Sequence, residues 1–186
     1  MRSITRPPTR RADGESTDPM RSEIAIDIEA PADLVFALAH DVERWSTLLP
    51  HYVRSRAGAH DARGRPVVEF IARRPLVPVL GLGLPVVWWS RTWNEPETRQ
   101  LRFEHVAGAT RGMDVTWRIE PTGDGAACRV TIEHEFAPRL PGFAGFVDRF
   151  FTRPIAGRTL ATFKALAEAL HEAPQSASPA VTNPST

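Results

Sequence analysis

The hydrophobic pattern of the chain begins with a short alternating segment. Isoleucines recur at every second position from Ile24 to Ile28, which predicts a strand with one buried and one exposed face. Pro31 then stands at the favoured first position of a helix, and the apolar spacing after it predicts that helix. A second short helix is expected at 42–49, because Pro50 ends it.

Turn signals divide the middle of the chain into alternating segments, which are typical of antiparallel strands. We expect strands at 51–59, 65–73, 86–93, 100–106, 112–120 and 126–136. The segment Pro75–Pro85 (PLVPVLGLGLP) is entirely apolar, but its three prolines and two glycines predict irregular structure. The last element is a long amphipathic helix at 143–171, which Pro154 is expected to kink or divide.

Matching the apolar phases of neighbouring strands predicts their register, since a shift of one residue would turn every side chain over. We expect Trp117 opposite Val130, Leu101 opposite Trp117, and Thr92 opposite Leu101. One face of the sheet is then apolar and the other charged, so the apolar face must be covered. We therefore expect an α+β fold in which a curved antiparallel sheet wraps around the C-terminal helix and leaves an apolar cavity between them.

Composition excludes several classes of function. The 186 residues include 23 basic and 22 acidic side chains, which argues against nucleic acid as a partner. The single cysteine, Cys128, excludes an intrachain disulfide and a cysteine-based zinc site, and we expect neither a metal nor a cofactor. With no apolar run of about 20 residues and no signal peptide, we expect a cytoplasmic protein. Polar tails at 1–21 and 172–186 are expected to be disordered around one domain at 22–171.

The inward face of the predicted sheet carries polar groups that suit acid–base chemistry. His105 and His134 titrate near neutral pH, so each can accept or deliver a proton. Tyr52 and Ser90 offer hydroxyl groups that can polarise a ligand carbonyl. A purely structural role, with each group hydrogen-bonded locally, remains an open alternative. The expected ligand-contacting wall consists of Trp45, Trp88, Thr92, Phe103, Met113, Val115 and Trp117.

Several longer stretches of the sequence carry a family resemblance. They are IAIDIEAPADLVFALAHDVERW, WWS, RGMDVTWRIEP, CRVTIEHEF and FFTRPIAGRTLATFKALAEAL. With them the chain resembles the helix-grip (START-like, SRPBCC) superfamily over 23–172, and most of all its polyketide cyclase/dehydrase and aromatase/cyclase branch. Trp45, Tyr52, Trp88 and Ser90 match aromatic and polar positions of that branch. Where the branch has two arginines in its pocket, this chain has Thr92 and His105.

The resemblance implies a cofactor-independent protein that binds a polyketide or aromatic apolar small molecule. It further implies cyclisation and dehydration by acid–base catalysis, for which His105, Ser90, Tyr52 and His134 are the candidates. The alternative is a non-enzymatic carrier or chaperone of a quinone or lipid, similar to coenzyme Q-binding proteins. We interpret Pro75–Pro85 as a lid over the cavity, or as a contact for an acyl-carrier protein or a membrane surface.

Overall fold

The computed structural model describes residues 20–77, 82–108, 110–137 and 143–176. Within these residues, seven antiparallel strands form one sheet in the order β1-β7-β6-β5-β4-β3-β2. The strands are β1 (Met20–Ile28), β2 (Tyr52–His60), β3 (Pro66–Val77), β4 (Leu82–Glu95), β5 (Gln100–Gly108), β6 (Met113–Thr122) and β7 (Ala127–Phe136). The helical elements are α1 (Ala32–Ala39), η1 (Val42–Arg44), α2 (Trp45–Leu48), η3 (Pro96–Thr98), α3 (Phe143–Val147), η4 (Asp148–Thr152) and α4 (Arg153–Ser176).

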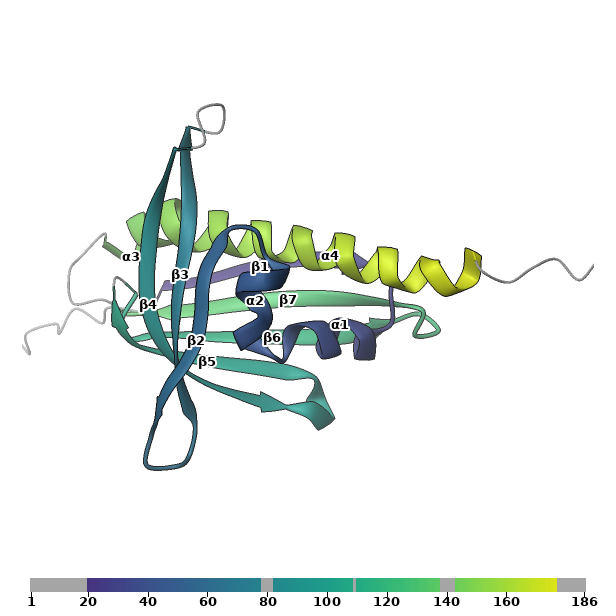
Figure 1. Cartoon of the computed structure of the whole chain (residues 1–186), viewed down its shortest axis with the longest axis horizontal. Helices are drawn as coiled ribbons and strands as arrows, with labels where there is room; N and C mark the ends of the chain where they lie inside the picture. Colours follow the sequence, from purple (N-terminus) through teal and green to yellow (C-terminus); the bar gives the residue numbers. More distant parts are fainter. Residues whose placement is uncertain (1–19, 78–81, 109, 138–142, 177–186) are drawn as a thin grey trace, which may run out of the picture.

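The sheet curves around α4, the long helix that crosses its inner side in Figure 1. The helix packs against β1, β3 and α1, and buries one stripe consisting of Ile155, Ala156, Thr159, Leu160, Phe163 and Ala167. Alternate residues of β5, β6 and β7 face this stripe and form the other half of the core. The predicted helix-grip architecture, with two short helices after the first strand, is therefore confirmed.

The register prediction was correct for one hairpin and wrong for two. Leu101 lies opposite Trp117, as expected. Trp117, however, pairs with Ile132, and Thr92 pairs with Phe103, so both pairings are displaced by two residues from the prediction. A register shift between Trp89 and Ser90 moves the partner of Trp88 one residue further, to Gly108. A displacement of two keeps every side chain on its predicted face, because side chains alternate with a period of two.

The prediction of irregular structure at Pro75–Pro85 was wrong where the structure describes it. β3 and β4 continue as a two-stranded arm in which Pro75 pairs with Gly83 and Val77 with Leu82, and the arm projects beyond the rest of the sheet (Figure 1). In a two-stranded ribbon each strand has one unpaired side, so a proline can direct its missing N–H outwards. The tip of the predicted lid, 78–81, lies outside the described residues.

The predicted interruption of the C-terminal helix near Pro154 is confirmed. α3 is joined to α4 by a π-helical turn, η4, in which the Arg153 N–H donates to the carbonyl of Asp148. Proline cannot donate the backbone hydrogen bond of a regular helix, and a wider turn is one local response. α4 continues to Ser176, five residues past the predicted end, and β1 begins at Met20. The remaining parts of the two predicted tails lie outside the described residues.

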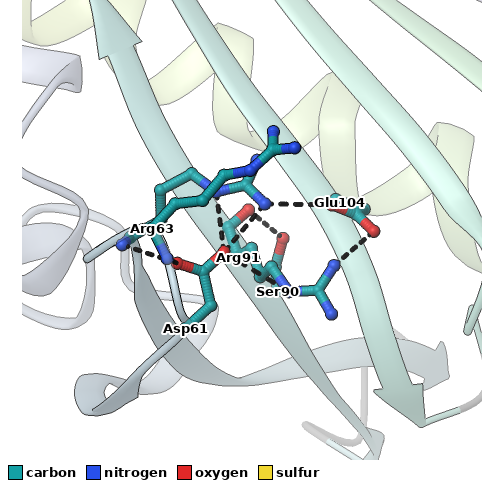
Figure 2. Close-up of polar contacts among 6 residues, drawn as sticks. Asp61, Arg63, Ser90, Arg91 and Glu104 are labelled. Carbon is teal, nitrogen blue, oxygen red and sulfur yellow. Dashed lines mark hydrogen bonds and ion pairs between the residues drawn. The ribbon is translucent and has the colours of Figure 1, made fainter.

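The outer face of the sheet carries an ion-pair network, shown in Figure 2. Asp61, in the turn between β2 and β3, accepts hydrogen bonds from the backbone N–H of Arg65 at 2.9 Å and from its Nε at 2.8 Å. On the neighbouring strands, Arg91 Nη1 donates to Glu104 Oε1 at 2.5 Å. Arg91 Nε lies 3.8 Å from Asp61 Oδ2, so the network connects the β2–β3 turn to β4 and β5.

Candidate functional site

An aromatic-lined cavity lies between the inner face of the sheet and the helical segment η4–α4. It measures about 70 Å³. Its lining consists of Trp45, Tyr52, Phe70, Val86, Trp88, Phe103, His105, Thr110, Met113, Val115, Trp117, Ile132, His134, Phe151, Thr152, Ile155, Ala156 and Thr159. The sheet forms one side of the cavity and η4–α4 the other, and most of the lining side chains are apolar or aromatic.

Trp45 is the centre of the aromatic wall. Its ring lies 5.4 Å from that of Tyr52, 5.3 Å from that of Trp117 and 5.6 Å from that of Phe103. These are distances at which tilted and edge-to-face ring pairs attract each other. The indole Nε1 donates to the carbonyl of Ala39 at 3.0 Å, at the end of α1, which fixes the orientation of the ring. The flat wall is therefore held in place before any ligand arrives.

His105 is the buried polar group with the clearest geometry in the cavity. Its Nδ1 lies 2.6 Å from Thr110 Oγ1, and its ring stacks on that of Trp88 at 6.0 Å. Burial lowers the pKa of His105 to about 3, and the nearby His134 acts in the same direction. The imidazole is therefore neutral at pH 7. It can serve as a hydrogen-bond donor or acceptor, but it does not carry the second ring proton that a general acid would release.

His134 lies on β7 and also faces the cavity. Burial lowers its pKa to about 4; the carboxylate of Asp148 and the backbone of Ser22 partly offset that effect, whereas the charge of Arg153 adds to it. Its Nδ1 has no hydrogen-bond partner among the described residues, and neither has Thr152 Oγ1 on the helical side of the cavity. This end of the cavity is therefore polar, whereas the wall around Trp45 is apolar.

A second polar group sits where α4 passes β2. His51 Nε2 lies 2.9 Å from Thr159 Oγ1, and that hydroxyl donates to the carbonyl of Ile155 at 2.9 Å. Because Thr159 already donates its hydroxyl proton to Ile155, its oxygen can only accept from His51, which therefore donates through Nε2–H. Burial raises the pKa of Tyr52 well above its ordinary value, although a hydrogen bond with Thr159 acts in the opposite direction, so the phenol stays protonated.

The structure brings together nine of the eleven predicted site residues. They are Trp45, Tyr52, Trp88, Phe103, His105, Met113, Val115, Trp117 and His134. Ser90 and Thr92 are buried but do not line the cavity. The Ser90 hydroxyl donates to the carbonyl of Arg91 at 3.1 Å, and Thr92 lines a separate groove with His40 and Asn94.

Sequence reasoning missed the helical wall of the cavity and four lining residues outside it. The missed lining residues are Phe70, Val86, Thr110, Ile132, Phe151, Thr152, Ile155, Ala156 and Thr159. A signal for part of this wall was present, because Phe151, Ile155 and Thr159 recur at intervals of four and so share one helix face. Thr152 and Thr159 on an otherwise apolar helix face are a further signal, because threonine has a low helix propensity.

Two other features of the described residues bear on function. They contain no cluster of three or more histidine, cysteine, aspartate or glutamate side chains that could hold a metal ion. Nor does any helix in this part of the chain have the length and apolar character needed to cross a bilayer. The chemistry that the cavity offers comes from neutral imidazole, phenol and hydroxyl groups beside aromatic rings.

Comparison with known proteins gives a consistent assignment. A solved aromatase/cyclase, Zhui from Streptomyces sp. R1128, superposes with a TM-score of 0.61 at 20% identity, over 87% of this chain and 99% of that one. A START superfamily protein from Mycobacterium smegmatis gives a TM-score of 0.61 at 14% identity, over 81% and 98% of the two chains. These two likenesses show the fold.

Sequence similarity goes further than the fold. The chain is 30% identical over 129 residues to a Streptomyces cyaneus protein named "Putative polyketide cyclase", covering 68% of this chain and 81% of that protein. The family model described as "Polyketide cyclase / dehydrase and lipid transport" matches residues 19–170, which include the whole sheet and most of α4. The chain therefore belongs to the polyketide cyclase/dehydrase and lipid transport family.

Proposed function

We propose that the protein binds a polyketide or related aromatic molecule in the cavity and promotes its cyclisation and dehydration. The observation that carries the proposal is the neutral His105–Thr110 pair inside a cavity walled by aromatic rings. The walls suit flat conjugated intermediates, and the pair places one polar contact among them. Membership of the family supports the same reaction class.

In this reaction the walls and the polar groups have different tasks. The walls hold a flexible poly-β-ketone so that one methylene carbon meets one ketone carbon, which replaces a costly conformational search. A carbon–carbon bond forms, and the methylene proton ends on the former ketone oxygen; loss of water then follows. His105 and Tyr52 donate hydrogen bonds to the ketone that becomes electron-rich, and a neutral imidazole is able to do this.

The electronic state of the histidines favours a second candidate function. With pKa values of about 3 and 4, His105 and His134 are weak bases at neutral pH. A carrier or chaperone for a quinone or lipid needs only an apolar cavity and some polar contact at one end. The same cavity supports that function without any proton transfer.

The β3–β4 arm is the part of the protein that we propose for partner contact. Leu84, on the described part of the arm, is 46% exposed. An apolar residue on a projecting arm is suited to meet an acyl-carrier protein or a membrane surface. Either partner would deliver an apolar ligand.

A product assay separates the enzyme from the carrier. A poly-β-ketone produced by a minimal polyketide synthase is incubated with wild type, with His105→Phe, which keeps the ring on Trp88, and with the exposed control His60→Phe. The enzyme reading predicts that wild type changes the product distribution, and that His105→Phe reduces the change roughly 100-fold while the control does not. If the wild type alters no polyketide product, the enzyme reading fails and the carrier remains.

A further inference from the structure

Unpartnered buried polar atoms gather at one end of the cavity. Among the described residues, five buried side-chain polar atoms lack a hydrogen-bond partner, and four of them belong to this region. The four are Ser22 Oγ, His134 Nδ1, Asp148 Oδ1 and Thr152 Oγ1. Buried polar atoms without partners are rare and costly in folded proteins, so a cluster of them requires an explanation.

These four residues come from three elements that meet at this end. Ser22 on β1 lies directly opposite His134 on β7. Asp148 and Thr152 are the first and last residues of η4, and the charge of Asp148 acts on the His134 ring. π-helical turns of this kind occur frequently at functional sites. The convergence therefore combines an unusual backbone with unsatisfied side chains.

Two of the four residues line the cavity itself. His134 is 6% exposed and Thr152 is 8% exposed, so both are more than nine-tenths buried. His134 stands on the sheet side and Thr152 on the helical side of the same space. A polar group of a ligand at this end would therefore lie between two polar side chains that have no partner of their own.

The chemistry of the pair selects the kind of ligand group. Thr152 can donate or accept, and a neutral imidazole presents Nδ1 as either a donor or an acceptor. A ligand hydroxyl can also do both. Asp148 is paired with Arg153, whose Nε lies 2.7 Å from its Oδ2, so the two charges offset each other and neither an anion nor a cation meets an unpaired counter-charge there. A neutral hydroxyl therefore fits this end best.

We propose that His134 and Thr152 form a subsite for a neutral hydroxyl group, phenolic or alcoholic, of a ligand whose ring system lies against the aromatic wall. This inference rests on the proposed function, because it assumes that the cavity takes an aromatic ligand. It assigns a direction to that ligand, with its hydroxyl end at η4 and its apolar body near Trp45. Neither residue needs to transfer a proton for this role.

Isothermal titration calorimetry with 2-naphthol and 2-methylnaphthalene tests the subsite. The two probes share a ring system and differ by a hydroxyl against a methyl group of similar size. The measured quantity is the Kd of 2-methylnaphthalene divided by the Kd of 2-naphthol. We expect Thr152→Val and His134→Phe each to lower this ratio about fivefold to tenfold, the usual worth of one neutral hydrogen bond. The affinity for 2-methylnaphthalene should change less than about twofold.

Two further variants make the result specific. Thr162→Val is the matched control, because the Thr162 hydroxyl on α4 already donates to the carbonyl of Arg158 at 2.9 Å, and its ratio should equal that of wild type. Thr152→Ser keeps the hydroxyl and should restore the ratio. An unchanged ratio in both Thr152→Val and His134→Phe overturns the subsite but leaves the proposed function standing. Wild type that binds neither probe overturns both.

Discussion

Acidification should destabilise this protein well before its carboxylates titrate, because its cavity histidines are buried in the neutral form. The pKa of His105 is lowered to about 3 and that of His134 to about 4, whereas histidine in an unfolded chain titrates near 6.5. Between these values the unfolded chain binds a proton that the folded protein does not. The contribution of these two histidines to the free energy of unfolding is therefore fully present above about pH 6.5 and is lost as the pH falls towards 3.

The size of the effect follows from the two pKa values. At pH 5 an unfolded histidine is almost fully protonated and the folded His105 almost fully neutral, which costs about 2 kcal/mol relative to pH 7. His134 adds a similar amount. The pair thus removes about 4 kcal/mol from a total stability of roughly 5–15 kcal/mol. Asp61 does not contribute between pH 7 and pH 5, because an unfolded aspartate titrates at about 3.9 and the backbone N–H of Arg65 lowers the pKa of Asp61 in the folded protein.

Urea unfolding of wild type, His105→Gln and His60→Gln at pH 7, 6 and 5 measures this contribution. Glutamine keeps a polar side chain but does not titrate, so the loss of stability from pH 7 to pH 5 should be about 2 kcal/mol smaller in His105→Gln than in wild type. The exposed His60→Gln is the control and should follow wild type. Parallel profiles for wild type and His105→Gln would refute the reasoning.

Three further outcomes are expected. Gly108→Ala should lower the free energy of unfolding in urea by about 3 kcal/mol, because an added Cβ at φ +91° would lie 2.4 Å from the Val87 carbonyl oxygen. The control Gly112→Ala has a similar φ of +87° but open space around the Cβ, and it should lower that free energy by only about 1 kcal/mol. Asp61→Asn should lower the urea midpoint slightly, by an amount that shrinks in high salt, since the network it weakens lies on the outer face. Leu84→Glu should leave stability unchanged and weaken binding to an acyl-carrier protein or to lipid vesicles, and unchanged binding to both would contradict the role of the arm.

The element order could be predicted from the sequence because most elements carry their own local signal. The strand register could be predicted only to its parity, since apolar phase decides which face a side chain takes but not which partner it meets. The partner is set by the turn. Between β6 and β7 the observed turn closes with Thr122 opposite Ala127, and Gly123 and Gly125 supply the positive φ angles that this closure requires.

Most of the sheet side of the cavity was predictable and the helical side was not. Residues such as Trp117 and His105 follow from strand alternation alone, whatever the register. The helical wall depends on how η4 rotates Phe151 and Thr152 towards the sheet, and a π-helical turn leaves no reliable pattern in the sequence. Ser90 was predicted to line the cavity and does not. Strand alternation directs its side chain inwards, but its hydroxyl donates to the carbonyl of Arg91.

The π-helical turn before Pro154 makes the chain sensitive to length at this point. A residue removed from 148–152 would convert the wide turn towards a regular one and rotate the upstream helix by about 100° relative to α4. Phe151 and Thr152 could not both keep their places in the cavity lining after such a rotation. Insertions and deletions should therefore be tolerated less well in these five residues than substitutions, and homologues that vary in length here should differ in which ligands they accept.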